Sequence, residues 1–418
     1  MSCTHTVVLI RRDHPPGASK YPLMLQEVLF KPLLRWMSDA LYAAGGRSVR
    51  IIRDDLSLDA PLLRCFAPQW SDIALLDANA SDIGRTVLSY LSGGAEETLF
   101  ITAPALLTGR TVASLCQAHA SGDNLLTELL ADDEHPTGLY CLTGAAAAGT
   151  LFSYLDRRFD LPDACRRMTA DDIPLGSFFV SDSSGGAVRV QNTQALQMAR
   201  QTMQSAVVER HMRQGVAVLD PSSAVISSEA VIGRDTTLLP GVVIQGETVI
   251  GEDCVIGPFT VLNHCAVGDR CTINASQLYD SRMGSDVKVG PYAYVRPNCV
   301  LGSRIKIGDF VELKNAHIGS GTKVPHLSYV GDSDVGEGVN IGCGSITVNY
   351  DGKKKHRTVV ENGAFIGCNS NLVSPVTVGQ NAYTAAGSTI TGNVPPGALG
   401  IARARQVNKE GWAEKKNK

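Results

Sequence analysis

The chain has 418 residues, of which 44% are hydrophobic and 19% charged, and its formal net charge is −3. This length is enough for two or three domains, and the composition is that of a folded globular protein. The small net charge argues against a nucleic-acid-binding protein, and no apolar run has transmembrane length. We therefore expect neither nucleic-acid binding nor membrane insertion.

The eleven cysteines are dispersed along the chain without a CxxC pair. An odd, scattered set in a long chain is typical of reduced thiols rather than of a disulfide framework. Because the N-terminus also lacks the apolar segment of a secretory signal, we predict a cytoplasmic protein. No cysteine and histidine cluster has the spacing of zinc ligands, so we predict no metal site.

Residues 1–188 alternate strand-like and helix-like segments, which predicts an α/β domain with a mainly parallel sheet. One helix is predicted from Leu29 to Ala44, where it ends at a glycine pair. The predicted strands are Thr6–Ile10, Val49–Ile52, Ile73–Leu76 and Thr98–Thr102.

A single helix over Asn192–Arg213 is predicted to link this domain to the rest of the chain, within a linker at residues 189–216. Gly215 follows as a plausible C-terminal stop. One face of this helix is apolar and suited to core packing. The residues of that face are Leu196, Ala199, Met203 and Val207.

Residues 217–402 repeat a short apolar residue followed by glycine at six-residue intervals, as in Val289-Gly290 and Ile307-Gly308. Six is not a helical period, and it suits a short strand plus a turn with one side chain in a narrow core. Three such strands make one coil of about eighteen residues, so the repeat predicts a parallel β-helix of roughly ten coils. Residues 403–418 form a separate C-terminal tail.

Polar and charged side chains interrupt the hexads between Arg296 and Tyr350. The period then lapses between Val348 and Thr358 in an excursion loop with four cationic side chains, which suit an anionic ligand such as a phosphate or a coenzyme. His326 is the best candidate for proton transfer, because a neutral imidazole accepts a proton at physiological pH.

At these positions the sequence resembles the bacterial bifunctional N-acetylglucosamine-1-phosphate uridyltransferase/glucosamine-1-phosphate N-acetyltransferase family. The resemblance covers nearly all of the chain beyond residue 215, and it implies a left-handed β-helix that forms a homotrimer with acetyl-CoA bound between subunits. The stretches that carry it are Val295–Pro297, Asp309–Asn315, His326–Asp332, Val339–Gly344, Thr347–Gly352 and Lys409–Trp412.

The resemblance also implies roles for individual residues. His326 would be the general base that takes a proton from the amine of glucosamine 1-phosphate. The amino-sugar phosphate would be bound by Arg296, Lys314, Tyr329, Asn340 and Lys355. Acetyl-CoA, the cosubstrate, would be lined by Cys343, Asn349, Tyr350, Cys368, Ala386 and Arg403. Family members commonly have Ala at the first of these positions and Ser at the fourth.

The N-terminal domain departs from the family pattern. Leu9–Gly17 replaces the glycine-rich loop that cradles nucleotide phosphates, and its two prolines lack N–H donors. The family's magnesium-binding Asp falls at Thr102 or Ala103, and its second metal ligand, an Asn, falls at Gln191. We predict a degenerate nucleotidyltransferase-like domain that has lost uridyltransferase activity and binds Mg²⁺ weakly at most.

The predicted function is acetyl-CoA-dependent N-acetylation of glucosamine 1-phosphate, in the synthesis of UDP-N-acetylglucosamine for peptidoglycan and other cell-envelope precursors. Three alternatives stay open at this point. The chain could acetylate another amino sugar, it could be bifunctional and also make UDP-N-acetylglucosamine from UTP, or it could be a non-enzymatic scaffold.

Overall fold

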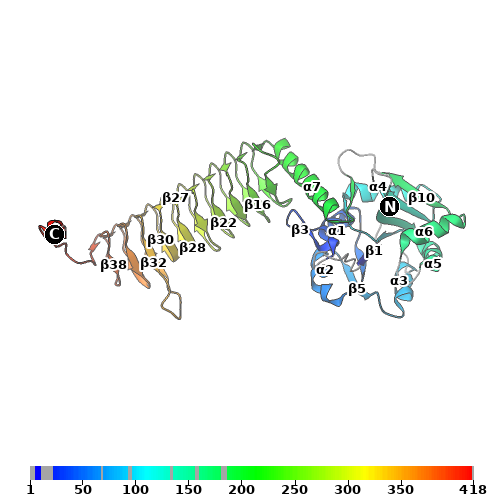
Figure 1. The fold of residues 1–418 in the computed structure, drawn as a ribbon, viewed down its shortest axis with the longest axis horizontal. Helices are drawn as coiled ribbons and strands as arrows, with labels where there is room; N and C mark the ends of the chain where they lie inside the picture. The colour runs from blue at the N-terminus through cyan, green and yellow to red at the C-terminus, as the bar shows by residue number, and fades with distance from the viewer. Residues whose placement is uncertain are drawn as a thin grey trace. The chain divides into compact units, whose positions relative to one another are not determined.

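The computed structural model describes residues 5–10, 22–66, 69–92, 97–131, 135–155, 160–179 and 186–416. The chain divides into two compact units, Met1–Met203 and Gln204–Lys418. Figure 1 shows the first as an α/β fold and the second as a stack of coils, with the long helix α7 (Thr193–Arg213) between them in the sequence. None of the helices in the described part of the chain has the length and apolarity needed to cross a bilayer.

A seven-stranded mixed sheet forms the centre of the first unit. Its strands are β1 (His5–Ile10), β4 (Ser48–Arg53), β5 (Asp72–Asp77), β6 (Glu97–Ile101), β8 (Leu126–Leu130), β9 (Pro136–Thr143) and β10 (Leu175–Phe179). Their order is β10-β8-β9-β6-β1-β4-β5. Strand β9 is antiparallel to both neighbours, and all other pairs are parallel, which confirms the predicted mainly parallel sheet.

Two small antiparallel pairs and several helices complete this unit. The pairs are β2 (Glu27–Val28) with β3 (Lys31–Pro32) and β7 (Ala105–Leu107) with β11 (Ala187–Arg189). The α-helices are α1 (Leu33–Ala43), α2 (Asp59–Cys65), α3 (Ile83–Ser92), α4 (Gly109–Ala120), α5 (Gly144–Tyr154) and α6 (Leu161–Ala170). The 3₁₀ helices are η1 (Leu23–Leu25) and η2 (Leu56–Leu58).

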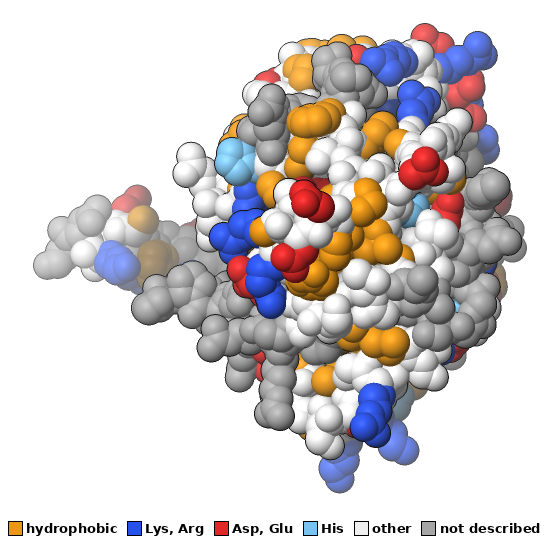
Figure 2. Space-filling view, turned by 90° about the vertical axis from the view of Figure 1, so that its right-hand side faces the viewer, with side chains coloured by type: hydrophobic (Ala, Val, Ile, Leu, Met, Phe, Trp, Pro, Cys, Tyr) orange, Lys and Arg blue, Asp and Glu red, His pale blue; other side chains and the backbone are white. Residues whose placement is uncertain are grey.

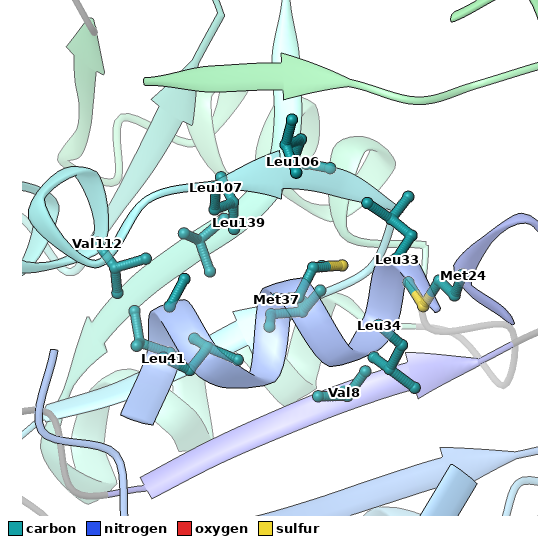
Figure 3. Close-up of a cluster of buried hydrophobic side chains, with 14 of the residues drawn as sticks. Val8, Met24, Leu33, Leu34, Met37, Leu41, Leu106, Leu107, Val112 and Leu139 are labelled. Atoms are coloured by element: carbon teal, nitrogen blue, oxygen red, sulfur yellow. The ribbon is translucent and has the colours of Figure 1, made fainter. Parts of the chain in front are cut away.

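Strand β1 is apolar on both sides because it separates two hydrophobic cores. Val8 belongs to one core and Val7 to the other, as the alternation of side chains along a strand requires. Figure 3 shows the first core, where Leu34 and Met37 of α1 lie between Val8 and Leu139 of the sheet. The position of α1 is therefore set by burial of its apolar face.

The predicted strands are confirmed at β1, β4, β5 and β6 to within one residue at each end. The predicted helix Leu29–Ala44 begins too early, since α1 starts at Leu33. Leu29 and Phe30 instead form the turn of the β2–β3 hairpin, with positive φ angles of 47° and 66°. Apolar spacing alone did not separate this turn from the helix that follows.

Helix α7 confirms the predicted linker helix. The side-chain oxygen of Asn192 accepts a hydrogen bond from the backbone N–H of Ala195 at 2.8 Å, which caps the helix N-terminus. Leu196 and Val207 of the predicted apolar face are only 2% and 4% exposed. Gly215, at a φ of 91°, adopts the left-handed conformation that ends helices.

The second unit is a parallel β-helix with three ladders of strands. One ladder is an eleven-stranded sheet, and the other two are joined in a seventeen-stranded sheet. The eleven strands are β12 (Ala217–Val218), β15 (Thr237–Leu238), β18 (Val255–Ile256), β21 (Thr272–Ile273), β24 (Lys288–Val289), β27 (Lys306–Asp309), β29 (Lys323–His326), β31 (Asn340–Ile341), β34 (Phe365–Ile366), β37 (Tyr383–Thr384) and β39 (Leu399–Gly400).

The seventeen-stranded sheet supplies the other two faces of the coils, and its longest strands, β28 and β30, belong to both. Its members are β13 (Val225–Ile226), β14 (Val231–Ile232), β16 (Val243–Gln245), β17 (Val249–Ile250), β19 (Val261–Asn263), β20 (Ala266–Val267), β22 (Gln277–Tyr279), β23 (Arg282–Met283), β25 (Tyr294–Val295), β26 (Val300–Leu301), β28 (Glu312–Ile318), β30 (Tyr329–Val335), β32 (Ile346–Val348), β33 (Thr358–Val360), β35 (Asn371–Val373), β36 (Val376–Val378) and β38 (Thr389–Ile390). A short helix, α8 (Trp412–Lys416), lies in the tail.

The hexad residues explain why the coils stack. Apolar residues such as Ile273 and Ile307 are fully buried in the narrow core. The glycine that follows allows the next coil to approach, because a Cβ at Gly308 would overlap the carbonyl oxygen of Pro325. With eleven strands on one face, the predicted parallel β-helix of roughly ten coils is confirmed. The predicted left hand of the coils stays a prediction.

The fold predicts an acid sensitivity at the end of α7. Burial, with a smaller contribution from the Arg210 guanidinium, lowers the pKa of His211 to about 4, and the side chain is 1% exposed. Between pH 6.5 and 4 the unfolded chain therefore binds a proton that the folded chain does not. The contribution of the neutral imidazole to the free energy of unfolding is complete above pH 6.5. It is lost as the pH falls towards the folded pKa and below, by about 3 kcal/mol in total.

We expect His211→Gln to lose less unfolding free energy than the wild type between pH 7 and pH 4, measured by urea unfolding of the full chain. Other groups titrate in both proteins, so the difference between the two pH profiles is the quantity that reports on His211. Parallel profiles would contradict this assignment.

Candidate functional site

His326 and Asp309 form a hydrogen-bonded pair on neighbouring coils. They lie in register on β29 and β27, with Nδ1 of His326 2.6 Å from Oδ1 of Asp309. The imidazole is 54% exposed and the carboxylate 39%, so a substrate can reach the ring. Hydrogen bonding to the imidazole lowers the pKa of Asp309. Asp309 therefore orients the ring and leaves Nε2 as the nitrogen able to accept a proton.

Arg296 is held by an acidic residue one coil further on. Its Nη1 donates to Oε1 of Glu312 at 2.9 Å, and this hydrogen bond raises the pKa of Arg296. Both side chains are 38% exposed. Since one guanidinium has five N–H donors, the remaining ones can bind an anion while Glu312 fixes the orientation.

A buried carboxylate organises the polar residues beside Arg296. Asp332, 5% exposed, accepts hydrogen bonds from Nδ2 of Asn315 at 2.6 Å and Nδ2 of Asn349 at 2.5 Å. The same amide of Asn349 lies 3.3 Å from the hydroxyl of Tyr329. The structure thus joins Asn349, expected at the coenzyme, to Tyr329, expected at the sugar phosphate.

Lys314 and Lys355 place two amines side by side. Hydrogen bonding with Lys355, followed by burial, lowers the pKa of Lys314, and the Arg296 charge acts in the same direction. Lys355 comes from the excursion loop, where its backbone forms an isolated antiparallel β-bridge with that of Tyr350. Three basic residues near one another repel, and an anion bound between them would relieve that repulsion.

The excursion loop projects from the β-helix between β32 and β33 (Figure 1). Asp351 shapes it, because its Oδ1 accepts from the backbone N–H groups of Lys353 and Lys354, each at 2.7 Å. Arg357 makes two hydrogen bonds to Asp334, at 2.8 and 2.6 Å. Arg357 therefore anchors the loop to β30 through Asp334.

The residues expected at the coenzyme form a line across successive coils. Cys343, Cys368 and Ala386 follow β31, β34 and β37 at equivalent positions. The backbone N–H of Asn369 donates to the carbonyl of Cys343, and that of Gly387 to the carbonyl of Cys368, each at 2.8 Å. Cys368 is exposed and Cys343 half-buried. Arg403 is exposed near this line, since a Cβ at Gly387 would lie 3.8 Å from its Cδ.

One chain does not join all of the expected site residues. Arg296, Lys314, Lys355, Tyr329 and Asn349 are linked by hydrogen bonds or charge interactions around the seventeen-stranded sheet. His326 and Asn340 belong to strands of the eleven-stranded sheet. Within the described residues, no side-chain hydrogen bond or ion pair connects these two groups.

Sequence reasoning missed three acidic residues that position the site. Asp309, Glu312 and Asp332 each hold an expected site residue or its neighbour through the contacts above. The signal was present, because each partner lies 16 or 17 residues away, the length of one coil. A search for acid–base pairs at that spacing would have found Asp309 and Glu312, and a search that included amide partners would also have found Asp332.

The first unit gives partial information on its expected nucleotide site. Most of the segment Leu9–Gly17 lies outside the described residues. Thr102 is tied to Gly138, whose carbonyl accepts from its backbone N–H at 2.8 Å and its hydroxyl at 3.3 Å. Gln191 lies with its side-chain amide at the guanidinium of Arg189. Neither position supplies a carboxylate for a metal ion.

One group of three potential metal ligands lies in the described part of this unit. Glu97, Cys116 and Cys141 are buried, with their ligand atoms within 4.8 Å of one another. Cys116, however, is disulfide-bonded, so its sulfur is not a thiolate ligand in this state. The prediction of reduced thiols is thus wrong for Cys116, whereas Cys141 and the other described cysteines are free.

Acidic and basic side chains are interspersed on the face of the molecule shown in Figure 2, so the described residues of this face form no area of a single charge sign. The first unit also contains a cavity. The cavity, of about 380 Å³, has mainly apolar walls with two arginines. Its lining residues are Leu25, Pro32, Arg35, Pro61, Arg64 and Cys65.

Comparison with known proteins defines the class first. Residues 229–264, 280–315 and 357–392 match the family model described as bacterial transferase hexapeptide (six repeats). These repeats coincide with coils of the β-helix, so the second unit is a hexapeptide-repeat transferase domain. Among solved structures, a CMP:2-keto-3-deoxy-manno-octonic acid synthetase complexed with CTP covers 48% of this chain and 98% of its own, at 14% identity and a TM-score of 0.36. That score is too low to support an argument.

Full-length relatives then define the family. The bifunctional protein GlmU of Caldanaerobacter subterraneus subsp. tengcongensis is 37% identical over 441 residues, covering 96% of this chain and 95% of that protein. Those of Brevibacillus brevis and a Geobacillus species are 58% and 52% identical, but their matches span only 48% and 52% of their own lengths, about half. The chain belongs to the family of bifunctional GlmU proteins.

Proposed function

We propose that this chain transfers the acetyl group of acetyl-CoA to the amine of glucosamine 1-phosphate, forming N-acetylglucosamine 1-phosphate in the cytoplasm. This product would serve the synthesis of UDP-N-acetylglucosamine and cell-envelope precursors such as peptidoglycan. The observation that carries the proposal is the exposed His326–Asp309 pair on a β-helix that also stacks Arg296 and Lys314 on consecutive coils. A base and a phosphate receptor are the two elements that this reaction needs.

In the proposed reaction the amine nitrogen attacks the carbonyl carbon of the thioester, forming the C–N bond. Nε2 of His326 accepts the proton that the nitrogen loses. The C–S bond then breaks, and the coenzyme sulfur leaves with a proton as the free thiol. Asp309 stabilises the imidazolium between these two steps, because its carboxylate faces Nδ1 at 2.6 Å.

The phosphate of the amino sugar is proposed to bind Arg296, Lys314 and Lys355. Their clustering lowers the pKa of Lys314, which an anion would reverse by favouring the charged amine. Tyr329 and Asn340 are proposed to bind sugar hydroxyl groups, for which both carry donor and acceptor atoms. An acetyltransferase acting on another amino sugar would not require this phosphate group.

Acetyl-CoA is proposed to lie along the line of Cys343, Cys368 and Ala386, with Asn349, Tyr350 and Arg403 as further contacts. Small side chains at three successive coils leave the backbone accessible to an extended ligand. Asn349 would have a second role in this arrangement, because its amide also fixes Tyr329.

A homotrimer is proposed as the active form. The support is the separation of His326 and Asn340 from Lys314 and its neighbours, which lie on different sheets of one chain. A neighbouring copy could pack its seventeen-stranded sheet beside the eleven-stranded sheet of the first copy. His326 of one copy and Lys314 of the other would then reach the same substrate.

The first unit is proposed to lack uridyltransferase activity and to bind Mg²⁺ weakly at most. Thr102 and Gln191, where the metal ligands would fall, offer no carboxylate. The competing candidate is a bifunctional enzyme, which the bifunctional Caldanaerobacter relative favours because its similarity extends over 96% of this chain.

The acetyltransferase proposal predicts release of free coenzyme thiol when the full chain is incubated with glucosamine 1-phosphate and acetyl-CoA. His326→Ala should lower kcat by about 10²- to 10⁴-fold, the usual contribution of a general base. Asp309→Asn should lower it less, by about 10- to 100-fold, because it acts through the imidazole.

His264→Ala is the matched control, since His264 is also exposed in a coil of the β-helix. Its rate should equal that of the wild type. No thiol release by the wild type would refute the function, and full activity of His326→Ala would refute only the assignment of the base.

The trimer proposal predicts complementation between two inactive variants. Co-expressed His326→Ala and Lys314→Ala chains should assemble at random into trimers, and about one quarter of all sites should combine an intact histidine with an intact lysine from the neighbour. Light scattering should give three times the mass of the chain. Mixed trimers without activity would show that both groups act within one copy.

The N-terminal proposal predicts no pyrophosphate release above background with UTP, Mg²⁺ and N-acetylglucosamine 1-phosphate. The same preparation must release coenzyme thiol in the acetylation assay, which controls for folding. Pyrophosphate formed in proportion to enzyme would establish the bifunctional alternative.

A further inference from the structure

Three lysines are stacked in register on the eleven-stranded sheet. Lys288 pairs with Lys306, and Lys306 with Lys323, on β24, β27 and β29. All three side chains are exposed. Strands in a parallel sheet lie about 4.8 Å apart, and like charges directly opposite one another are destabilising. The structure places three such charges in one row.

The neighbouring turns of the same coils avoid this repulsion. From Asp253 to Arg304 the successive left-handed turn positions alternate in sign, although Asp235 one coil earlier repeats the charge of Asp253. Arg270 makes two hydrogen bonds to Asp286, at 2.9 and 3.0 Å. The Arg270–Asp286 pair thus neutralises stacked charges at this turn, whereas the lysine row places three like charges together, which an external anion would compensate.

The lysine row leads to the candidate site. Lys306 and Asp309 share strand β27, and Lys323 and His326 share β29, each pair three residues apart, which is roughly 10 Å along a strand. The next residue of the same row after Lys323 is Asn340.

We propose that Lys288, Lys306 and Lys323 form an anion-docking strip that captures ligands with linked phosphate groups and delivers them to His326. Amines on flexible stems, one per coil, can contact several phosphate oxygens of one such ligand without fixing its orientation. The strip is an encounter site, distinct from the line of Cys343, Cys368 and Ala386. Its consequence for catalysis rests on the proposed acetyl-CoA-dependent function.

The binding test uses inorganic tripolyphosphate and needs no catalysis. At low salt, tripolyphosphate should raise the Tm of the wild-type full chain. In the triple variant Lys288→Gln/Lys306→Gln/Lys323→Gln, the rise should fall to less than half, with the rest due to the group around Lys314. Without tripolyphosphate, the variant should be at least as stable as the wild type, because the repulsion is gone.

The matched control is Arg213→Gln/Arg282→Gln/Lys415→Gln, which removes the same total charge from exposed positions elsewhere. Its Tm should rise with tripolyphosphate as in the wild type. An undiminished rise in the lysine variant, or an equal loss in the control, would overturn the strip.

The kinetic test follows kcat/KM for acetyl-CoA. In the lysine variant it should fall about 10-fold at low salt with kcat unchanged, and the difference should vanish at 0.5 M salt, roughly where screening removes steering. A wild-type chain without acetyltransferase activity would refute the proposed function, while the Tm test still decides on the strip. An active wild type with an unchanged kcat/KM in the variant would refute the strip's delivery role.

Discussion

Every coil of the β-helix hydrogen-bonds the next in register. This stacking places an outward side chain beside one that is usually 16 to 18 residues away, or 25 where the excursion loop lengthens the coil. Asp309 therefore meets His326, Glu312 meets Arg296, and Asp332 receives Asn315 and Asn349. The buried hexads hold this register, since a slip would expose apolar residues and bury charged ones. The chemistry of the second unit depends on that constraint.

The same stacking makes charge arrangement informative. Stacked turn residues of opposite charge form an ion pair at Arg270 and Asp286, whereas cations are stacked at two places. One is the group of Arg296 and Lys314, and the other is the row that includes Lys306. Repulsion held in place by a rigid scaffold favours a bound anion, which is why both places are argued to receive phosphate groups.

The two units differ in the functional side chains that they present. The β-helix presents matched motifs, an oriented histidine and clustered bases. The α/β unit presents a sheet with two cores and polar positions such as Thr102, which bonds to the backbone of Gly138 rather than offering a carboxylate. The proposals for the two units are accordingly tested by separate assays on one preparation.

The sequence by itself determined the β-helix, the strands around β1 and the linker helix α7, because each follows from a local periodicity of apolar residues. It also marked His326 and the basic residues as candidate site residues through motifs. Tertiary structure decided what no local pattern contains: the start of α1 after a hairpin, the carboxylate behind His326, the anchoring role of Arg357 and the disulfide at Cys116. The contacts of Asp309 with His326 and of Asp334 with Arg357 join residues 17 and 23 positions apart, and they exist only once the coils stack.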